Sequence, residues 1–401
     1  MEYKEILENH SFIRSRYEYG THNLFLCYKK KNYSKEKKYN DYNLYKYQKV
    51  YRYLDGDNYF KKDTFYRSYY SMKKLFFEDF DYMPETYCYP DEKIIIENRF
   101  KDYKFNLSDL WLIKPANLDS GRGITFLSSI KNINMTDFII SKYIRNINLI
   151  NDKKYDLRLY VLITGLKPLR IYFYKEGLVR IAAEKFFLNE SSINNKFIHL
   201  TNTAINKFSK NFIKPNNSQN RNSNTWNIFM YKNFLKEKNI EWDIVKEKIK
   251  DIIIKSIISV HQNLIEENER KKVDDQSFYD ILGFDIIITD DFIPKLIEIN
   301  FSPDLKIYNS LEKHIKSNLI IDTLNLIGIT PFSRRTYKTL NPKINFHSDI
   351  DENINNALCE LERPKGDFEM IFPKKENINK YKKYFFNNSK ENIEFWNKII
   401  Y

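Results

Sequence analysis

Three oxygen-bearing side chains, Asp285, Glu298 and Asn300, interrupt the apolar segment GFDIIITDDFIPKLIEINFSP at residues 283–303. Alternation along two short strands places Asp285 on one face of the first strand, and Glu298 with Asn300 on one face of the second. The intervening TDDFIP supplies turn residues, so we expect an antiparallel hairpin on which the three side chains converge. Burying carboxylates among isoleucines is costly without a cation, and Mg²⁺ prefers hard oxygen ligands. The pattern favours a magnesium site over outward-facing polar residues on a half-exposed strand.

A second group of residues could hold phosphate. Residues 111–124 read WLIKPANLDSGRGI, so a strand delivers Lys114 and a loop with Gly121, Arg122 and Gly123 follows. Glycines let backbone N–H groups approach phosphate oxygens, and a lysine supplies a point charge. The chain has only nine glycines, which favours this interpretation over an ordinary tight hairpin turn. The pattern GxxxxGK[ST] is absent from the sequence, which excludes a P-loop enzyme.

A third group combines opposite charges. The segment KKYDLRLYVLIT at residues 153–164 places Asp156 and Arg158 on one strand face, opposite a row of leucines. This pattern indicates a site, and an internal ion pair is an alternative of equal weight. Arg180 and the segment HLTNTAINK at residues 199–207 add polar groups that suit phosphates and carboxylates.

A scaffold of short strands must position these residues. Residues 106–205 contain apolar runs rich in β-branched and aromatic side chains, separated by turn residues. One run, FIISKYI at residues 138–144, could pair with an adenine edge, although by itself it indicates only a strand. Apolar residues at helical spacing predict a helix over residues 243–266, and another is expected at residues 307–326. We therefore predict an N-terminal lobe (1–105), a central lobe (106–205), a third lobe with the hairpin (206–330) and an irregular C-terminal extension (331–401).

The composition is that of a folded protein. Hydrophobic residues make up 42% and charged residues 30% of the chain, and 31 Tyr with 30 Phe exclude a disordered chain. Cys27, Cys88 and Cys359 form no CxxC pair, which argues against a disulfide framework or zinc module and favours a reducing compartment. We find neither a signal peptide nor an apolar membrane span, and expect a cytoplasmic protein. The net charge of +13 attracts acidic partners such as nucleic acid, anionic membranes or acidic tails, with a merely solvated surface as the alternative.

Together, these motifs resemble those of the tubulin–tyrosine ligase-like family, which belongs to the ATP-grasp superfold. The matching segments follow the family's order and spacing over about residues 40–330: WLIKP…GRGI, SKYI, KYDLRLYVLIT, LRIYFYKEGLVR, HLTNTAINK and GFDIII…KLIEINFSP. A weaker match, SMKKL with MPETYCYP, lies upstream. The resemblance implies an α+β fold, an ATP-grasp ligase in which antiparallel sheets sandwich the nucleotide beside a smaller N-terminal lobe.

The resemblance also implies roles for individual residues. Catalysis would depend on Lys114, Arg180 and Glu298. ATP contacts are implied for Lys73, Lys114, Ser120, Gly121, Ser141, Lys142, Tyr143, Ile144, Lys154, Asp156, Thr201 and Asn202. The substrates would be bound by Arg122, Arg158, Arg180, Thr203 and Lys207. The metal ligands would be Asp285, Glu298 and Asn300.

Three positions depart from the family pattern. Many members have glutamine where Ser120 and Ser141 stand, and tyrosine where Thr203 stands. Serine is too short to replace a glutamine amide contact at the same distance, although backbone groups at Ser141 can still contact adenine. The change at Thr203 bears on which amino acid is joined.

These residues suit the activation of a carboxylate by ATP. A substrate carboxylate would attack the γ-phosphate to give an acyl phosphate and ADP, and an incoming amine would then displace phosphate and form an amide. Negative charge grows on the transferred phosphoryl group, so Mg²⁺, Lys114 and arginine side chains would stabilise it. No enzyme nucleophile is required, in keeping with six His and three Cys in the chain.

The resemblance implies tubulin, with its acidic C-terminal tails, as the acceptor of a free amino acid. Glutamate is the preferred amino acid, glycine is its close rival, and tyrosine is disfavoured. The alternatives from other classes are a microtubule-binding pseudoligase without turnover and a basic nucleic-acid-binding protein, for which no motif is present. We expect a monomer in the cytoplasm on the cytoskeleton, including the cilium or basal body, with neither nucleic acid nor membrane as partner.

Overall fold

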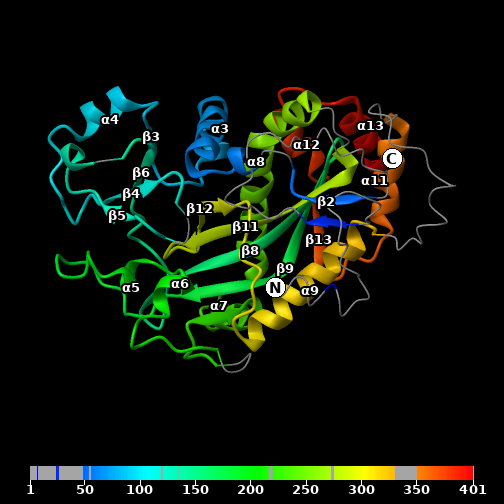
Figure 1. Cartoon of the computed structure of the whole chain (residues 1–401). Helices are drawn as coiled ribbons and strands as arrows, with labels where there is room; N and C mark the ends of the chain where they lie inside the picture. Colours follow the sequence, from blue (N-terminus) through cyan, green and yellow to red (C-terminus); the bar gives the residue numbers. More distant parts are fainter. Residues whose placement is uncertain are drawn as a thin grey trace.

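The computed structural model describes residues 7, 24–26, 48–53, 56–118, 121–133, 135–215, 220–271, 275–329 and 350–400. In these ranges the chain forms a four-stranded sheet and a nine-stranded sheet, with helices packed around them (Figure 1). The fold is therefore mixed α+β, as the sequence predicts.

The small sheet is antiparallel and lies beside the tip of the larger one (Figure 1). Its strands, in spatial order, are β3 (Thr86–Tyr89), β6 (Phe138–Lys142), β4 (Trp111–Pro115) and β5 (Thr125–Phe126). Helix α4 (Lys93–Phe100) covers its outer face, where Trp111 and Ile113 pack against Phe100. Because side chains alternate along a strand, Leu112 and Lys114 point to the opposite, inner face.

The large sheet is mixed. Its main path runs β1 (Leu24–Leu26), β2 (Lys49–Tyr51), β11 (Phe278–Ile288), β8 (Lys153–Leu166), β9 (Leu169–Ile181) and β10 (Thr225–Asn227). Strands β12 (Pro294–Asn300), β13 (Phe368–Phe372) and β7 (Leu149–Ile150) pair with β11, β9 and β8 respectively. The predicted antiparallel sheets are correct for most pairs, but β2 runs parallel to both β1 and β11. No short turn links β2 to β11 in sequence, so hairpin reasoning could not reveal this pairing.

Two helices sandwich the large sheet. The 29-residue α8 (Trp242–Arg270) covers one face, and α9 (Ser310–Leu326) covers the other (Figure 1). Strand β11 is buried along its whole length because Leu282 faces the α8 side and Ile281 the α9 side. This explains why the strands read as continuous apolar runs. Both predicted helices are confirmed, with slightly different ends.

Besides α4, shorter helices lie between residues 56 and 237. They are α2 (Gly56–Tyr59), α3 (Lys62–Leu75), α5 (Lys196–His199), α6 (Thr203–Asn206) and α7 (Ile228–Glu237). No helix in the described part of the chain is long and apolar enough to cross a membrane.

The C-terminal segment belongs to the fold. Residues 350–400 form α11 (Ile350–Leu361), β13, α12 (Ile378–Tyr381) and α13 (Lys390–Ile400). Glu360 Oε1 accepts hydrogen bonds from Thr164 (2.6 Å), Arg170 (3.0 Å) and Tyr172 (2.8 Å). The predicted irregular extension is therefore wrong for these residues, whose many charges obscure the buried face of each helix, and residues 331–349 lie outside the described ranges.

Strand pairing also crosses the lobe boundaries placed at residues 105 and 205. Strand β3 pairs with β6, so the small sheet takes one strand from the predicted N-terminal lobe. Strand β8 pairs with β11, which joins the predicted central and third lobes in one sheet. Sequence position alone thus misassigns which segments share a sheet.

Candidate active site

The predicted hairpin exists, and its three oxygen-bearing side chains converge. Strands β11 and β12 are antiparallel, and Asp285 lies directly opposite Glu298 next to a register shift. The Asn300 amide nitrogen lies 3.3 Å from Asp285 Oδ2 and 3.5 Å from Glu298 Oε1. Asp285 is buried, whereas the Glu298 side chain keeps 22% exposure. The hairpin therefore presents two carboxylates and an amide at one place.

Two arginines neutralise the buried end of this group. Strand registers place Arg158 opposite Asp285 and Arg180 opposite Asp156. Arg158 donates two hydrogen bonds to the Asp285 carboxylate, while Arg180 bridges Asp285 (2.9 Å) and Asp156 (2.8 Å). We call these four residues the arginine cluster. Burial raises the pKa of Asp285, but the two guanidinium groups outweigh it and hold that pKa well below its usual range.

Neighbouring residues hold the arginine cluster in place. Thr201 donates a hydrogen bond of 2.8 Å to Asp156. A Cβ at Gly283 would come within 3.2 Å of the Arg158 side chain and 2.9 Å of Pro303. Glycine at this position therefore makes room for the guanidinium group that pairs with Asp285.

Two lysines beside this cluster have no carboxylate in ion-pair contact among the residues that the structure describes. Lys114 is 7% exposed and makes no hydrogen bond or ion pair with any described residue. Burial lowers the pKa of Lys114 to about 8, Glu298 opposes this effect and Lys62 adds to it. Burial lowers the pKa of Lys154 to about 7, Asp156 opposes this effect and Lys114 adds to it. We call Lys114 and Lys154 the lysine pair, and its surplus positive charge suits an anion.

Sequence reasoning missed Lys62, at the start of α3. Its Nζ lies 3.7 Å from Glu298 Oε2 and donates a 2.7 Å hydrogen bond to the carbonyl of Leu118. Lys62 therefore joins the hairpin to the loop that follows β4. One lysine among several on a charged helix gives no signal in the sequence.

Lys73 lies elsewhere. It occupies the last turn of α3, about 16 Å along the helix axis from Lys62, and forms a 2.7 Å ion pair with Asp81. Asp81 also faces Lys295, at 3.7 Å. The structure thus brings Lys62, and not the predicted Lys73, to the other site residues, because the first turn of α3 faces the hairpin.

The glycine loop approaches the segment that contains Asn202. Gly121 and Gly123 have φ angles of 76° and 71°, a region that favours glycine. A Cβ at Gly121 would lie 2.9 Å from the Asn202 side-chain oxygen. The loop and Asn202 therefore lie together, as the proposed phosphate contacts require, while Ser120 falls outside the described residues.

A pocket of about 370 Å³ opens on the inner face of the small sheet. The residues around it include Leu112, Phe126, Tyr143, Lys196, His199 and Leu200. Ser141 pairs with Leu112 on this face, but its hydroxyl is buried 3.0 Å from that of Thr86. We call this cavity the inner-face pocket, and the apolar and aromatic side chains among its mixed lining suit a flat aromatic ring.

The remaining predicted residues are not among those that line the inner-face pocket. Lys142 points to the outer face, 5.6 Å from the centre of the Trp111 ring, and Ile144, two residues further on, is partly buried. Thr203 begins α6, and Lys207 follows that helix with its ammonium 5.1 Å from the exposed Phe208 ring. Arg122 is exposed in the glycine loop.

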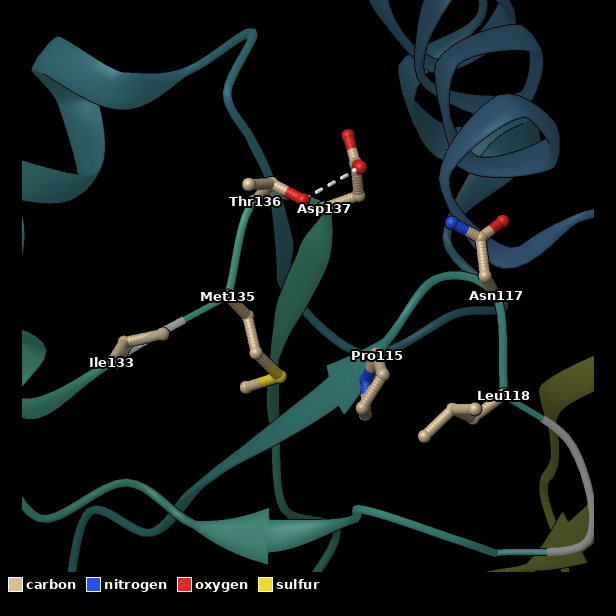
Figure 2. A pocket seen from close by; sticks show the side chains of 7 residues that line it. All are labelled: Pro115, Asn117, Leu118, Ile133, Met135, Thr136 and Asp137. Carbon is tan, nitrogen blue, oxygen red and sulfur yellow. Dashed lines mark hydrogen bonds between the residues drawn. The ribbon is translucent and has the colours of Figure 1, made fainter.

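A second hollow, of about 420 Å³, lies beside the loop that follows β4 (Figure 2). It is lined by Pro115, Asn117, Leu118, Ile133, Met135, Thr136 and Asp137. None of these residues is basic, and Thr136 donates a 3.0 Å hydrogen bond to the Asp137 carboxylate. This hollow is therefore poorly suited to phosphate, in contrast to the surroundings of the lysine pair.

The residues of the hairpin fit a divalent cation. Glu298 and Asp285 supply carboxylate oxygens, and rotating the Asn300 amide by half a turn would place its oxygen where its nitrogen now lies. Beside them, the lysine pair provides positive charge for an anion such as a polyphosphate. These residue types therefore suit a metal ion and a phosphate side by side.

The chain is similar to known tubulin-modifying enzymes. It is 29% identical over 314 residues to "Tubulin polyglutamylase ttll-5" of Caenorhabditis elegans, covering 75% of this chain and 43% of the relative. It is 31% identical over 273 residues to "Tubulin monoglutamylase TTLL4" of Mus musculus, covering 67% and 22%. It is 32% identical over 277 residues to "Probable beta-tubulin polyglutamylase" of Tetrahymena thermophila, covering 67% and 23%. The chain spans less than half the length of these relatives.

A family model covers most of the chain. The model described as "Tubulin-tyrosine ligase family" matches residues 31–337, which include the small sheet, the arginine cluster, the lysine pair and the hairpin. The motifs from which the sequence resemblance was drawn lie in the same span. The chain belongs to the tubulin–tyrosine ligase family.

Proposed function

We propose that this protein is an ATP-dependent ligase that adds glutamate to the acidic tails of tubulin. The observation that supports it most directly is the lysine pair beside the oxygen-bearing side chains of the hairpin: within the described part of the chain, neither ammonium group has a carboxylate in ion-pair contact. An unneutralised buried charge is costly to keep unless a ligand compensates for it. Magnesium-ATP would offset these charges, since its phosphates are anions and its cation prefers oxygen ligands.

In this proposal the nucleotide lies between the small and large sheets, in the manner of ATP-grasp enzymes. The inner-face pocket would take the adenine ring, with backbone groups of residues 141–144 at its edge. Lys114, Lys154 and the loop at Gly121 would contact the phosphates, together with Thr201 and Asn202. Lys62 joins this group, because it lies between Glu298 and the loop.

Asp285, Glu298 and Asn300 would hold Mg²⁺, which, when bound, offsets the negative charge of the phosphates. Lys114 would stabilise the charge that grows on the γ-phosphoryl group as a substrate carboxylate oxygen bonds to phosphorus and ADP leaves. The amine of the second substrate would then attack the acyl carbon, release phosphate and lose a proton, which leaves an amide bond. No step requires a nucleophile from the protein.

Carboxylate recognition would fall to the buried arginines of the arginine cluster and to the residues Arg122, Thr203 and Lys207. Arg158 and Arg180 already share Asp156 and Asp285, so the four charges of the arginine cluster cancel. Their remaining N–H groups, with Arg122, Thr203 and Lys207, would orient a free amino acid and the tubulin side chain. A surface charge of +13 would draw an acidic tail toward them, with weaker binding as salt rises.

The names of the similar proteins support glutamate and tubulin, and a tubulin glycine ligase is the close alternative. A microtubule-binding pseudoligase is disfavoured, because the lysine pair and the hairpin carboxylates are costly charges without a ligand. The proposal places the protein as a monomer on the cytoskeleton, including the cilium or basal body.

One experiment tests the substrate directly. The protein is incubated with Mg²⁺, ATP and tubulin, together with glutamate, glycine or tyrosine, and the tubulin tails are examined by mass spectrometry. We expect masses that increase by glutamate residues only. If only glycine is added to the tails, the amino-acid substrate is glycine and not glutamate. If ATP is consumed but the tails stay unmodified, tubulin is not the acceptor. A Glu298→Gln variant serves as the matched control, and full activity in it would contradict the magnesium assignment.

A further inference from the structure

A continuous chain of hydrogen bonds runs behind the inner-face pocket. Lys154 Nζ lies 3.2 Å from the hydroxyl of Tyr143, which lies 2.9 Å from His199 Nδ1. The other ring nitrogen of His199, Nε2, lies 3.1 Å from the carbonyl oxygen of Ser192. The chain links a member of the lysine pair to a backbone group at the far side of the pocket wall.

The chemistry of the partners fixes the direction of every bond in the chain. The Ser192 carbonyl can only accept, so His199 Nε2 must carry a hydrogen. Burial lowers the pKa of His199 to about 4, and Lys154 adds to this effect, so the ring is neutral at pH 7 and has one N–H. His199 Nδ1 must therefore accept from the Tyr143 hydroxyl, whose oxygen is left to accept from Lys154.

The histidine ring is held firmly in this orientation. It meets Phe126, Tyr143 and Phe186 edge-on, with ring centres 5.2, 5.6 and 6.1 Å away. Ser192, which anchors the chain, is itself fixed by two hydrogen bonds to Asn189, of 2.8 and 3.0 Å. A buried tyrosine and a buried histidine thus act as a rigid support for one flexible lysine.

We infer that His199 is a positioning residue, which holds the Tyr143 hydroxyl and through it the Lys154 ammonium group at the wall of the ATP site. The inference rests on the proposed function, because Lys154 is there assigned to the phosphates. A lysine has a long flexible side chain, and a lysine held in its bound position loses less conformational freedom when the nucleotide arrives. His199 touches neither the phosphates nor the reacting atoms in this role.

The first test measures the dissociation constant of Mg-ATP by calorimetry in matched variants. His199→Leu removes both ring nitrogens, whereas His199→Asn keeps an acceptor near the place of Nδ1. We expect about a tenfold weaker binding for His199→Leu, the effect of about 1.4 kcal/mol, and recovery to within about twofold for His199→Asn. Equal weakening in both variants would contradict the inference. Tyr143→Phe removes only the hydroxyl and tests the same link if the histidine variants do not fold.

The decisive comparison uses Lys154→Met as a background. If His199 acts through Lys154, His199→Leu weakens ATP binding in the wild-type protein but has no further effect in the Lys154→Met protein. A tenfold effect that persists in that background overturns the inference. Wild-type protein that binds no ATP would overturn the proposed function as well, whereas ATP binding that depends on Lys154 but not on His199 would overturn the inference alone.

The pH dependence of ATP binding supplies a readout that a purely structural role would not change. The charged groups around Lys154 are Asp156 on its own strand and Lys114 on β4, while Tyr143, directly after β6, and the neutral His199 of α5 lie on its other side. The hydrogen bond to Tyr143 favours the protonated amine. Tyr143→Phe should therefore move the loss of ATP affinity to lower pH than in the wild-type protein. An unchanged midpoint pH of that loss would contradict the proposed role of the hydrogen bonds.

Discussion

Two groups of buried charge border the candidate site. In the arginine cluster, two guanidinium groups meet two carboxylates with short, paired hydrogen bonds, and the charges cancel within the protein. In the lysine pair, burial lowers both pKa values, to about 8 and about 7, and neither amine has a carboxylate in ion-pair contact among the described residues. The first group contributes to the architecture of the sheet. The second group keeps a positive charge that the phosphates of the proposed nucleotide would offset.

The largest expected effect comes from breaking the arginine cluster. Asp285→Asn leaves two buried guanidinium groups with one carboxylate between them, which costs about 3–5 kcal/mol of unfolding free energy. Urea unfolding followed by circular dichroism measures this loss. A loss below about 1 kcal/mol would show that Asp285 does not stabilise the free protein in this way.

Removal of a member of the lysine pair should not lower the free energy of unfolding, in contrast to removal of Asp285. Lys114→Met removes a buried amine whose pKa is lowered to about 8. Because burial of the charged amine opposes folding, the unfolding free energy should stay the same or rise, by up to about 3 kcal/mol at pH 7. ATP binding should fall at the same time. Destabilisation of the nucleotide-free protein by this change would make the lysine pair structural, and the contrast with Asp285 would disappear.

The same pair predicts how stability depends on pH. A lysine whose folded pKa lies below its unfolded value penalises folding while both states are protonated, and the penalty fades as pH rises through the folded pKa. Between about pH 7 and pH 10, the wild-type protein should therefore gain stability relative to a Lys114→Met/Lys154→Met variant. ATP affinity should fall over pH 7 to 8, as the protonated amines are lost. If the unfolding free energies of the two proteins change with pH in parallel, the lowered pKa values of Lys114 and Lys154 are contradicted.

The smallest effect distinguishes the two ends of α3. Lys73→Ala breaks an exposed ion pair with Asp81 and should change stability by less than about 1 kcal/mol, with ATP affinity unchanged. Lys62→Ala should weaken ATP binding severalfold, because Lys62 lies against Glu298 and the Leu118 carbonyl. Weaker ATP binding in Lys73→Ala, with Lys62→Ala unaffected, would reverse the assignment made from the geometry.

The sequence could predict features that depend on short-range pattern. Alternation and turn residues correctly predicted the hairpin of Asp285 and Glu298 and its antiparallel pairing, because both strands lie within one short segment, residues 278–300. Helical spacing correctly predicted α8. The facing positions of Asp156 and Arg158 on one strand were also visible from alternation alone.

Features that depend on strand order were beyond the sequence. Arg180 reaches Asp285 only because β8 lies between β9 and β11, an order that no local pattern encodes. Lys62 reaches Glu298 because of the way α3 packs on the hairpin, so its neighbours in sequence gave no indication. The same limit applies to β2, which pairs with a strand more than two hundred residues away.

The position of Glu360 has a practical consequence for the design of recombinant fragments. The family match ends at residue 337, but Glu360 neutralises Arg170, which is 2% exposed at the base of β9. A fragment that stopped at residue 337 would leave this guanidinium group without its carboxylate and would remove β13 from the edge of β9, where an unpaired strand promotes aggregation. Soluble, active protein should therefore require a boundary that lies after α13, and the family match alone would place the cut too early.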